Sequence, residues 1–185
     1  MDRRSGPALT VGRPHRTAPA GLDDVPGASS FGRAVARVVL GAVTWGMLMM
    51  LCAVISLYLR NRLETMHLGK IAAIFFAGGL LAWPLVLALT RLLTRRRGSE
   101  TRFAAAFALL SLGTIAMTAF LFAMDYRLFY AQWHQPFGTR TWMFQFLFTA
   151  LGASYQFTVM GLGLYLPAGL PVLAGASLWL ARTAR

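Results

Sequence analysis

Charged residues are scarce in this sequence, and acidic residues are the scarcest of them. Only 13% of the 185 residues are Asp, Glu, Lys or Arg, whereas a soluble domain has about 25%. The charges stand in short clusters between long uncharged runs, and 57% of the residues are hydrophobic. A soluble helix carries charges along one whole face, so this pattern predicts helices that span a bilayer.

Cysteine and catalytic motifs are also nearly absent. Cys52 is the only cysteine, which excludes an internal disulfide. It lies in an apolar stretch, where we interpret it as a small core residue rather than a reactive thiol. The sequence has no G-x-S-x-G motif, no P-loop and no glycine-rich dinucleotide motif in a strand–helix context. No named nucleophilic or phosphate-binding chemistry is therefore indicated.

Four apolar stretches are long enough to cross a bilayer as helices. They run over about 38–59, 71–90, 103–124 and 142–164. A hydrocarbon core of about 30 Å needs about 20 helical residues. The sequence therefore predicts an all-α integral membrane protein, a bundle of four transmembrane helices within residues 33–185. Residues 1–32 hold half of the eight prolines and are expected to form a disordered basic tail.

The last uncharged stretch, Thr141 to Leu180, is about twice as long as one crossing needs. The segment Leu166-Pro-Ala-Gly-Leu-Pro171 lies in its second half, and two prolines beside a glycine favour the end of a helix. We interpret residues 168–181 as a short hydrophobic segment that is re-entrant or interfacial. The alternative is two short tilted spans, which would give five crossings and a C-terminus outside.

Basic residues are distributed unevenly between the two sides of the predicted bundle. The N-terminal tail, the loop 91–102 and the C-terminus hold 13 of the 18, and the loops 60–70 and 125–140 hold the other five. The positive-inside rule then places both termini in the cytoplasm. We expect the basic residues behind the net charge of +12 to contact anionic lipid headgroups, and we expect no nucleic-acid partner. Abundant Ala, Gly and Leu with a single lysine indicate a GC-rich bacterial genome, and we therefore expect the spans to lie in a bacterial inner membrane.

The most distinctive local pattern follows the third predicted span. Five aromatic residues recur at i, i+3, i+4, i+7 and i+11, on one helical face: Tyr126, Phe129, Tyr130, Trp133 and Phe137. The spacing predicts a short amphipathic helix in the outer interface. Such a helix is either an aromatic belt, the common case, or a ledge for a lipid, a quinone or a partner's spans.

Polar and small residues mark faces of the predicted spans. In the fourth span, Gln145, Thr149 and Gln156 share one face. They either bond to neighbouring helices or line a path for a ligand or water. In the second span, Gly78 and Gly79 predict close packing of helices.

Ionisable residues near the spans are few. Asp125 ends the third span, where it is expected to pair with Arg127 or Arg140 or to mark the interface. His67 and His134 lie in the two outer loops without the local spacing of a metal site. We therefore expect no metal and no cofactor.

Three hypotheses on function stay open. The lack of buried charges and catalytic pairs favours a non-enzymatic accessory or assembly subunit, which would bind the bilayer and other subunits or itself. The second hypothesis is a small transporter or channel component lined by Gln145, Thr149 and Gln156. The third is a membrane enzyme that acts on lipid through His134 and Asp125.

Overall fold

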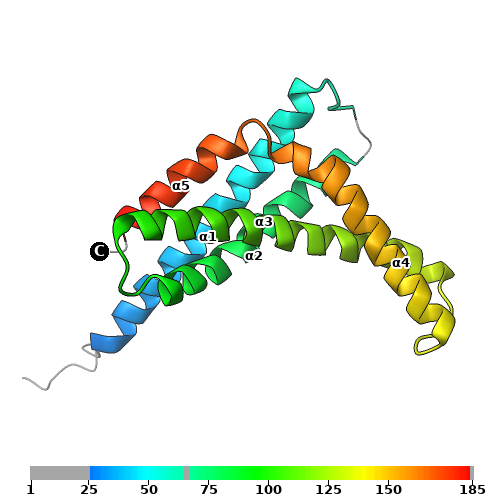
Figure 1. Cartoon of the computed structure of the whole chain (residues 1–185), viewed down its shortest axis with the longest axis horizontal. Coiled ribbons are helices and arrows are strands. Elements are labelled where there is room, and N and C mark those ends of the chain that lie inside the picture. Colours follow the sequence, from blue (N-terminus) through cyan, green and yellow to red (C-terminus); the bar gives the residue numbers. More distant parts are fainter. Residues whose placement is uncertain (1–25, 65–66, 184–185) are drawn as a thin grey trace, which may run out of the picture.

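Helices form every regular element of the part of the chain that the structure describes, residues 26–64 and 67–183. In this computed structural model the five long helices are α1 (Pro26–Leu59), α2 (Leu68–Leu93), α3 (Ser99–Tyr130), α4 (Arg140–Gln156) and α5 (Gly169–Thr183) (Figure 1). Three short elements join the later helices: the 3₁₀ turns η1 (Ala131–Trp133) and η3 (Leu162–Tyr165), and the π-helix η2 (Phe157–Gly161).

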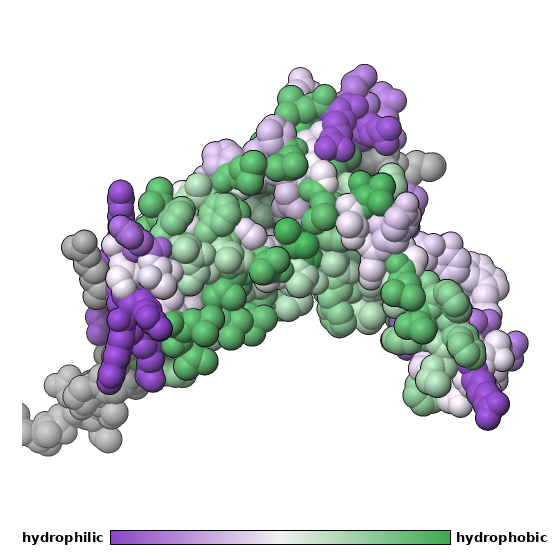
Figure 2. All heavy atoms as spheres, viewed as in Figure 1, coloured by the Kyte–Doolittle hydropathy of each residue, from purple (hydrophilic) through white to green (hydrophobic). Residues whose placement is uncertain are grey.

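Four helical stretches are long and apolar enough to cross a membrane. They are Phe31–Leu59, Leu68–Leu93, Ser99–Trp133 and Arg140–Tyr165, and each contains one of the four predicted spans. The prediction of an all-α chain with four such helices is confirmed. Hydrophilic residues gather at the edges of the molecule in Figure 2, and the surface between them is mainly hydrophobic.

Helix α1 begins earlier than the sequence predicted. It starts at Pro26, inside the tail that we expected to extend to residue 32. Proline is well suited to the first turn of a helix, because its fixed φ is helical and its missing N–H has no partner there in any case. The rest of the predicted tail, residues 1–25, lies outside the described residues.

Helix α3 has extensive contacts with three of the other four long helices. It packs against α2, α4 and α5, while α1 packs mainly against α2. Helix α4 has no extensive contact with α1 or α2 among the described residues, and Figure 1 shows it at the lower right beside the second half of α3, away from α1 and α2. The α1–α2 connection and the α3–α4 connection are therefore separated from each other.

The chain bends sharply at the proline-rich segment, but α5 does not run back along α4 (Figure 1). Helix α5 lies along α3 and ends beside the α2–α3 connection (Figure 1). The ring of Trp179 lies 6.4 Å from that of Trp83, and Ala181 is buried. The segment that we expected to be re-entrant or interfacial packs mainly against α3, because its small and apolar side chains fit there, and it meets α2 through Trp179 and Trp83.

The core lies between α1, α2, α3 and α5. Its buried side chains include Trp45, Met49, Trp83 and Leu110, and Cys52 belongs to it as a small core residue, as expected. One polar bond crosses this core: Trp45 Nε1 donates to Thr114 Oγ1 at 3.0 Å. The indole N–H thereby gains the partner that a buried tryptophan needs.

Two adjacent glycines allow α2 to approach both of its neighbours. A Cβ on Gly79 would lie 3.0 Å from the Cα of Gly46 on α1. A Cβ on Gly78 would collide with the side chain of Thr118 on α3. The close packing that Gly78 and Gly79 predicted is confirmed, and both helix contacts depend on the missing side chains.

Replacing Gly78 with alanine should therefore destabilise the bundle. We expect a loss of about 1–3 kcal/mol in the free energy of unfolding, the usual cost of overpacking a tight core. Gly175→Ala is the matched control, because no described residue beyond its own helical turn lies within 4 Å of a Cβ there. The control should be neutral or stabilising by about 0.5–1 kcal/mol. Unfolding in detergent measures both, and equal effects would contradict the assigned contact.

Candidate functional site

The α4–α5 connection is an irregular segment, residues 157–168, which we call the break. It consists of η2, η3, and a Leu166–Pro167 peptide bond that is cis. A π-turn followed by a 3₁₀ turn interrupts the regular ladder of backbone hydrogen bonds. Carbonyl groups in the break therefore need donors from elsewhere in the chain.

The end of α1 and the residue that follows it supply side-chain donors to one carbonyl. The Gly163 oxygen accepts from Ser56 Oγ at 3.2 Å and from Arg60 Nη2 at 2.8 Å, and from the Leu166 backbone N–H at 3.3 Å. A Cβ on Gly163 would lie only 2.8 Å from Arg60 Nη2, so glycine permits this approach. The end of α1 is thus fastened to the break.

Aromatic side chains hold the other side of the break. The ring of Phe157 is buried and lies 6.4 Å from Phe75 and 6.0 Å from Phe122. The ring of Tyr165 lies 4.9 Å from Phe75, and its hydroxyl donates to Thr118 Oγ1 at 2.7 Å. Helices α2 and α3 therefore both contact the break through rings, and α3 contacts it through a hydrogen bond as well.

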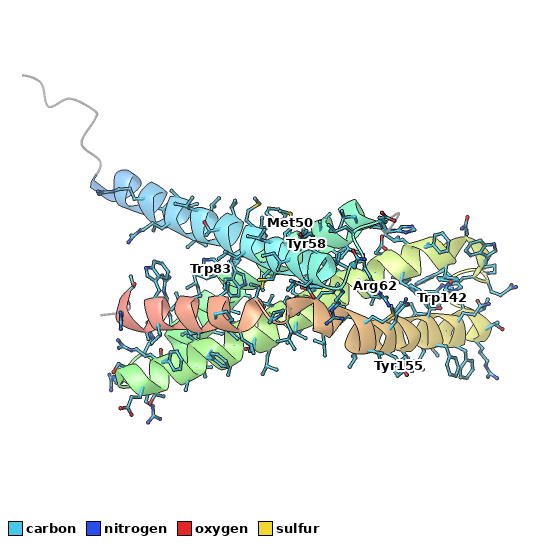
Figure 3. The ribbon with its side chains drawn as sticks, turned by 90° about the horizontal axis from the view of Figure 1, so that it is seen from above. Met50, Tyr58, Arg62, Trp83, Trp142 and Tyr155 are labelled. Carbon is cyan, nitrogen blue, oxygen red and sulfur yellow. The ribbon has the colours of Figure 1, made fainter. Side chains whose placement is uncertain are left out.

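A cavity of about 650 Å³ lies between the break and the α1–α2 connection, and we call it the cleft. Its polar side chains are Arg60, Arg62 and Gln156. Figure 3 shows Arg62 beyond the end of α1, next to the ribbon of the break. The remaining lining residues are apolar or glycine: Leu57, Ile71, Ile74, Phe75, Phe122, Phe157, Val159, Met160, Gly161 and Leu164.

A second, smaller cavity of about 220 Å³ lies on the other side of the break. It is lined by Trp45, Thr114, Tyr165 and the first turn of α5, among others. Trp45 and Tyr165 bond to Thr114 and Thr118, and the Ser111 hydroxyl donates to the Phe107 carbonyl of its own helix. Because its donors and acceptors are satisfied internally, this cavity offers a ligand mainly apolar contact.

Asp125 pairs with a partner that the sequence did not indicate. Its Oδ2 lies 2.9 Å from Lys70 Nζ, whereas we expected Arg127 or Arg140. Arg127 instead lies over the ring of Phe146, 4.6 Å from its centroid. The difference arises because the first turn of α2 lies beside the end of α3. Both side chains are more than a third exposed, so the pair contributes about 0–1 kcal/mol.

The five predicted aromatic residues do not form one separate amphipathic helix. Tyr126, Phe129 and Tyr130 complete α3, and Trp133 ends η1. Their rings make one cluster, with centroids of successive pairs 4.6 to 5.7 Å apart. Phe137 lies in the following loop, against Trp142 at 4.5 Å. The helical spacing fails there because His134 is extended and Pro136 follows.

The predicted polar face of the fourth span is divided between two places. Gln145 Oε1 accepts from the backbone N–H of Gln135 at 2.9 Å, and Thr149 Oγ1 lies 3.3 Å from His134 Nε2. These two side chains tie α4 to the loop that precedes it. Gln156 lies two turns further along the helix and lines the cleft instead.

Sequence reasoning missed Arg60 and Arg62 as site residues. Both were counted only as charges that flank a span. No local spacing connects Arg60 with Gly163, which lies 103 positions away in the chain. The nearest available signal was the pair of glycines at 161 and 163 ahead of two prolines, which indicates an irregular helix but not its partner.

The hydrogen bonds at the Gly163 carbonyl predict how the free energy of unfolding changes when their side-chain donors are removed. Ser56→Ala or Arg60→Met alone leaves the other side-chain donor, so each should have a small effect. The double variant should lose about 1–3 kcal/mol in the free energy of unfolding, because the carbonyl then keeps only one long backbone bond. Ser111→Ala is the matched control, since its hydroxyl bonds to Phe107 of its own helix. Single effects that simply add up would contradict shared bonding at Gly163.

Groups able to hold a metal do not converge in the described ranges 26–64 and 67–183, where no three His, Cys, Asp or Glu side chains come together. Comparison with family models, with curated proteins and with solved structures gives no match. A proposal on function therefore depends on the geometry of this chain alone.

Proposed function

We propose that this chain is a non-enzymatic accessory or assembly subunit of a larger complex in a bacterial inner membrane. It crosses the bilayer four times, with both termini in the cytoplasm. Four apolar helices of sufficient length support the crossings, and the excess of arginine at one end supports the orientation.

In this proposal the fourth crossing is a broken helix that includes α5. The chain passes from α4 through the break into α5, which ends close to the α2–α3 connection (Figure 1). Arg182 in the last turn of α5 and Arg95 to Arg97 in that connection then lie on the same side of the bilayer. The break then extends from the headgroup level, where Gly163 meets Arg60, into the membrane, and it is tolerated because protein groups satisfy its backbone.

The observation that carries the proposal is the exposure of α4. Only 11% of the most apolar window in its stretch, Arg140–Tyr165, is buried, against 22% to 33% for the other three stretches. The same stretch has the lowest mean hydropathy of the four. A span that is both the least apolar and the least covered gains more from protein neighbours than from lipid alone.

A stripe of large apolar side chains follows the uncovered face of α4. Its members, which we call the α4 stripe, are 56% to 71% exposed: Phe144, Phe148, Leu151 and Tyr155. Their spacing places them on one helical face, and Tyr155 points away from α3 in Figure 3. We propose that a span of the partner subunit packs against this stripe.

The alternatives find less support in the same geometry. A transporter lined by Gln145 and Thr149 would need side chains that face a passage, but both bond to the loop before α4. A lipid enzyme acting through His134 and Asp125 would need them together. His134 contacts Thr149 instead, and Asp125 pairs with Lys70.

Affinity purification in a mild detergent tests the proposal. The full chain should bring a second membrane protein in fixed stoichiometry. Phe148→Ala with Leu151→Ala should remove that partner while the chain stays folded, because the large side chains that fill the contact are lost. Mass spectrometry of the co-purified proteins is the measurement.

The matched control is Leu40→Ala with Leu51→Ala on α1, where the two side chains are 69% and 51% exposed. This double variant should keep the partner. A chain that purifies alone would overturn the subunit proposal, and so would a partner that the α4 variant retains.

A further inference from the structure

We infer that the cleft binds one anionic phospholipid, with the headgroup at Arg60 and Arg62 and an acyl chain along the apolar wall. The inference uses residues at the ends of α1 and α4 rather than the α4 stripe. It therefore stands independently of the proposed subunit function.

The size and lining of the cleft fit a lipid chain. Its volume of about 650 Å³ lies within the range of small-molecule sites, about 300–1,000 Å³. Phe75 and Phe157 are each only 3% exposed and form its inner wall together with Phe122. This wall can bury methylene groups, whereas a soluble anion has nothing to place against it.

The charge of the cleft selects the headgroup. Two guanidinium groups and one amide line it, and none of the described residues in its lining is acidic. Glu64, two positions beyond Arg62, is exposed and is not among them. Guanidinium forks bind phosphate oxygens with paired, charge-assisted hydrogen bonds. A zwitterionic headgroup places its own cation beside these arginines, which makes an anionic lipid the better partner.

Arg60 is held in place for this role. One of its five N–H donors bonds to the Gly163 oxygen at 2.8 Å, which leaves the rest of the guanidinium fixed at the cleft. A preorganised side chain loses little conformational entropy when a ligand arrives. The adjoining π-helix η2 supplies Phe157, Val159 and Met160 to the lining, and π-helical turns often occur at functional sites.

The cleft also lies at a suitable depth for a headgroup. It is bounded by the last turn of α1 and the first turns of α2, where two apolar helices of membrane-spanning length end and begin. Headgroups occupy the same level of a bilayer as the charged residues that flank its spans. The acyl chain then extends from the arginines along the break toward the membrane interior.

Native mass spectrometry of the delipidated protein tests the inference. The detergent-solubilised full chain is titrated with phosphatidylglycerol or with phosphatidylcholine of the same acyl chains. We expect a single phosphatidylglycerol to bind first. Arg62→Gln should weaken that binding roughly tenfold, the effect of losing one charge-assisted contact. The side chain of Arg62 is exposed and lies outside the helices, so the variant should fold.

Arg96→Gln is the matched control, because it removes the same charge from the exposed α2–α3 connection. It should leave binding unchanged. A second variant, Val159→Trp, fills the cleft without a change in charge and should reduce binding of both lipids. Its control is Val39→Trp, at a similarly exposed position on α1 that does not line the cleft.

Three results would overturn the inference. The first is equal binding of phosphatidylglycerol and phosphatidylcholine. The second is equal loss of binding in Arg62→Gln and Arg96→Gln, which would indicate a general attraction to positive charge. The third is displacement of the lipid by glycerol phosphate at a similar concentration, which would indicate a site for a free anion.

Discussion

The carbonyl group of Gly163 is the point on which the arrangement of the last third of the chain depends. A helix that must cross about 30 Å of hydrocarbon cannot leave backbone groups without partners. The break between α4 and α5 leaves backbone carbonyls without helical partners. At Gly163 the side chains of Ser56 and Arg60 both donate hydrogen bonds to the carbonyl oxygen. Tyr165 adds a bond to Thr118 on α3. These three contacts hold the irregular segment against α1 and α3.

The break has two consequences for the rest of the molecule. It lets α5 follow the first half of α3 and cover the core with Val172, Leu173 and Ala176. It also lets α4 diverge from α1 and α2, which opens the cleft and leaves the α4 stripe uncovered. An unbroken helix could not pack on the core at one end and diverge from α1 and α2 at the other. The two surfaces that we assign to function thus have one structural cause.

Much of the fold was predictable because its signals are local. Uncharged runs between arginine clusters predict the four apolar helices, and the adjacent glycines at 78 and 79 predict the tight helix contacts. Cys52 was correctly placed in the core by the apolar residues around it. Each of these predictions rests on composition within one helix, which the sequence displays directly.

The site was much less predictable because its contacts join distant parts of the chain. Arg60 meets Gly163 and Lys70 meets Asp125 only after the helices have packed, and no spacing in the sequence records either pair. The aromatic pattern that begins in the last turns of α3 was recognised, but its helical period could not show that the helix would end before Pro136. Sequence periodicity gives the face of a helix, whereas the partner of that face is a property of the tertiary structure.

The most direct test of this account is to determine on which side of the membrane α5 ends. In a Cys52→Ala background, single cysteines at Glu64, Gly98 and Thr183 can be labelled in intact cells with a maleimide that does not cross membranes. A broken fourth crossing predicts that only Glu64→Cys reacts, and that Gly98→Cys and Thr183→Cys react after the cells are opened. If Thr183→Cys reacted in intact cells together with Glu64→Cys, the chain would cross five times and the account would be wrong.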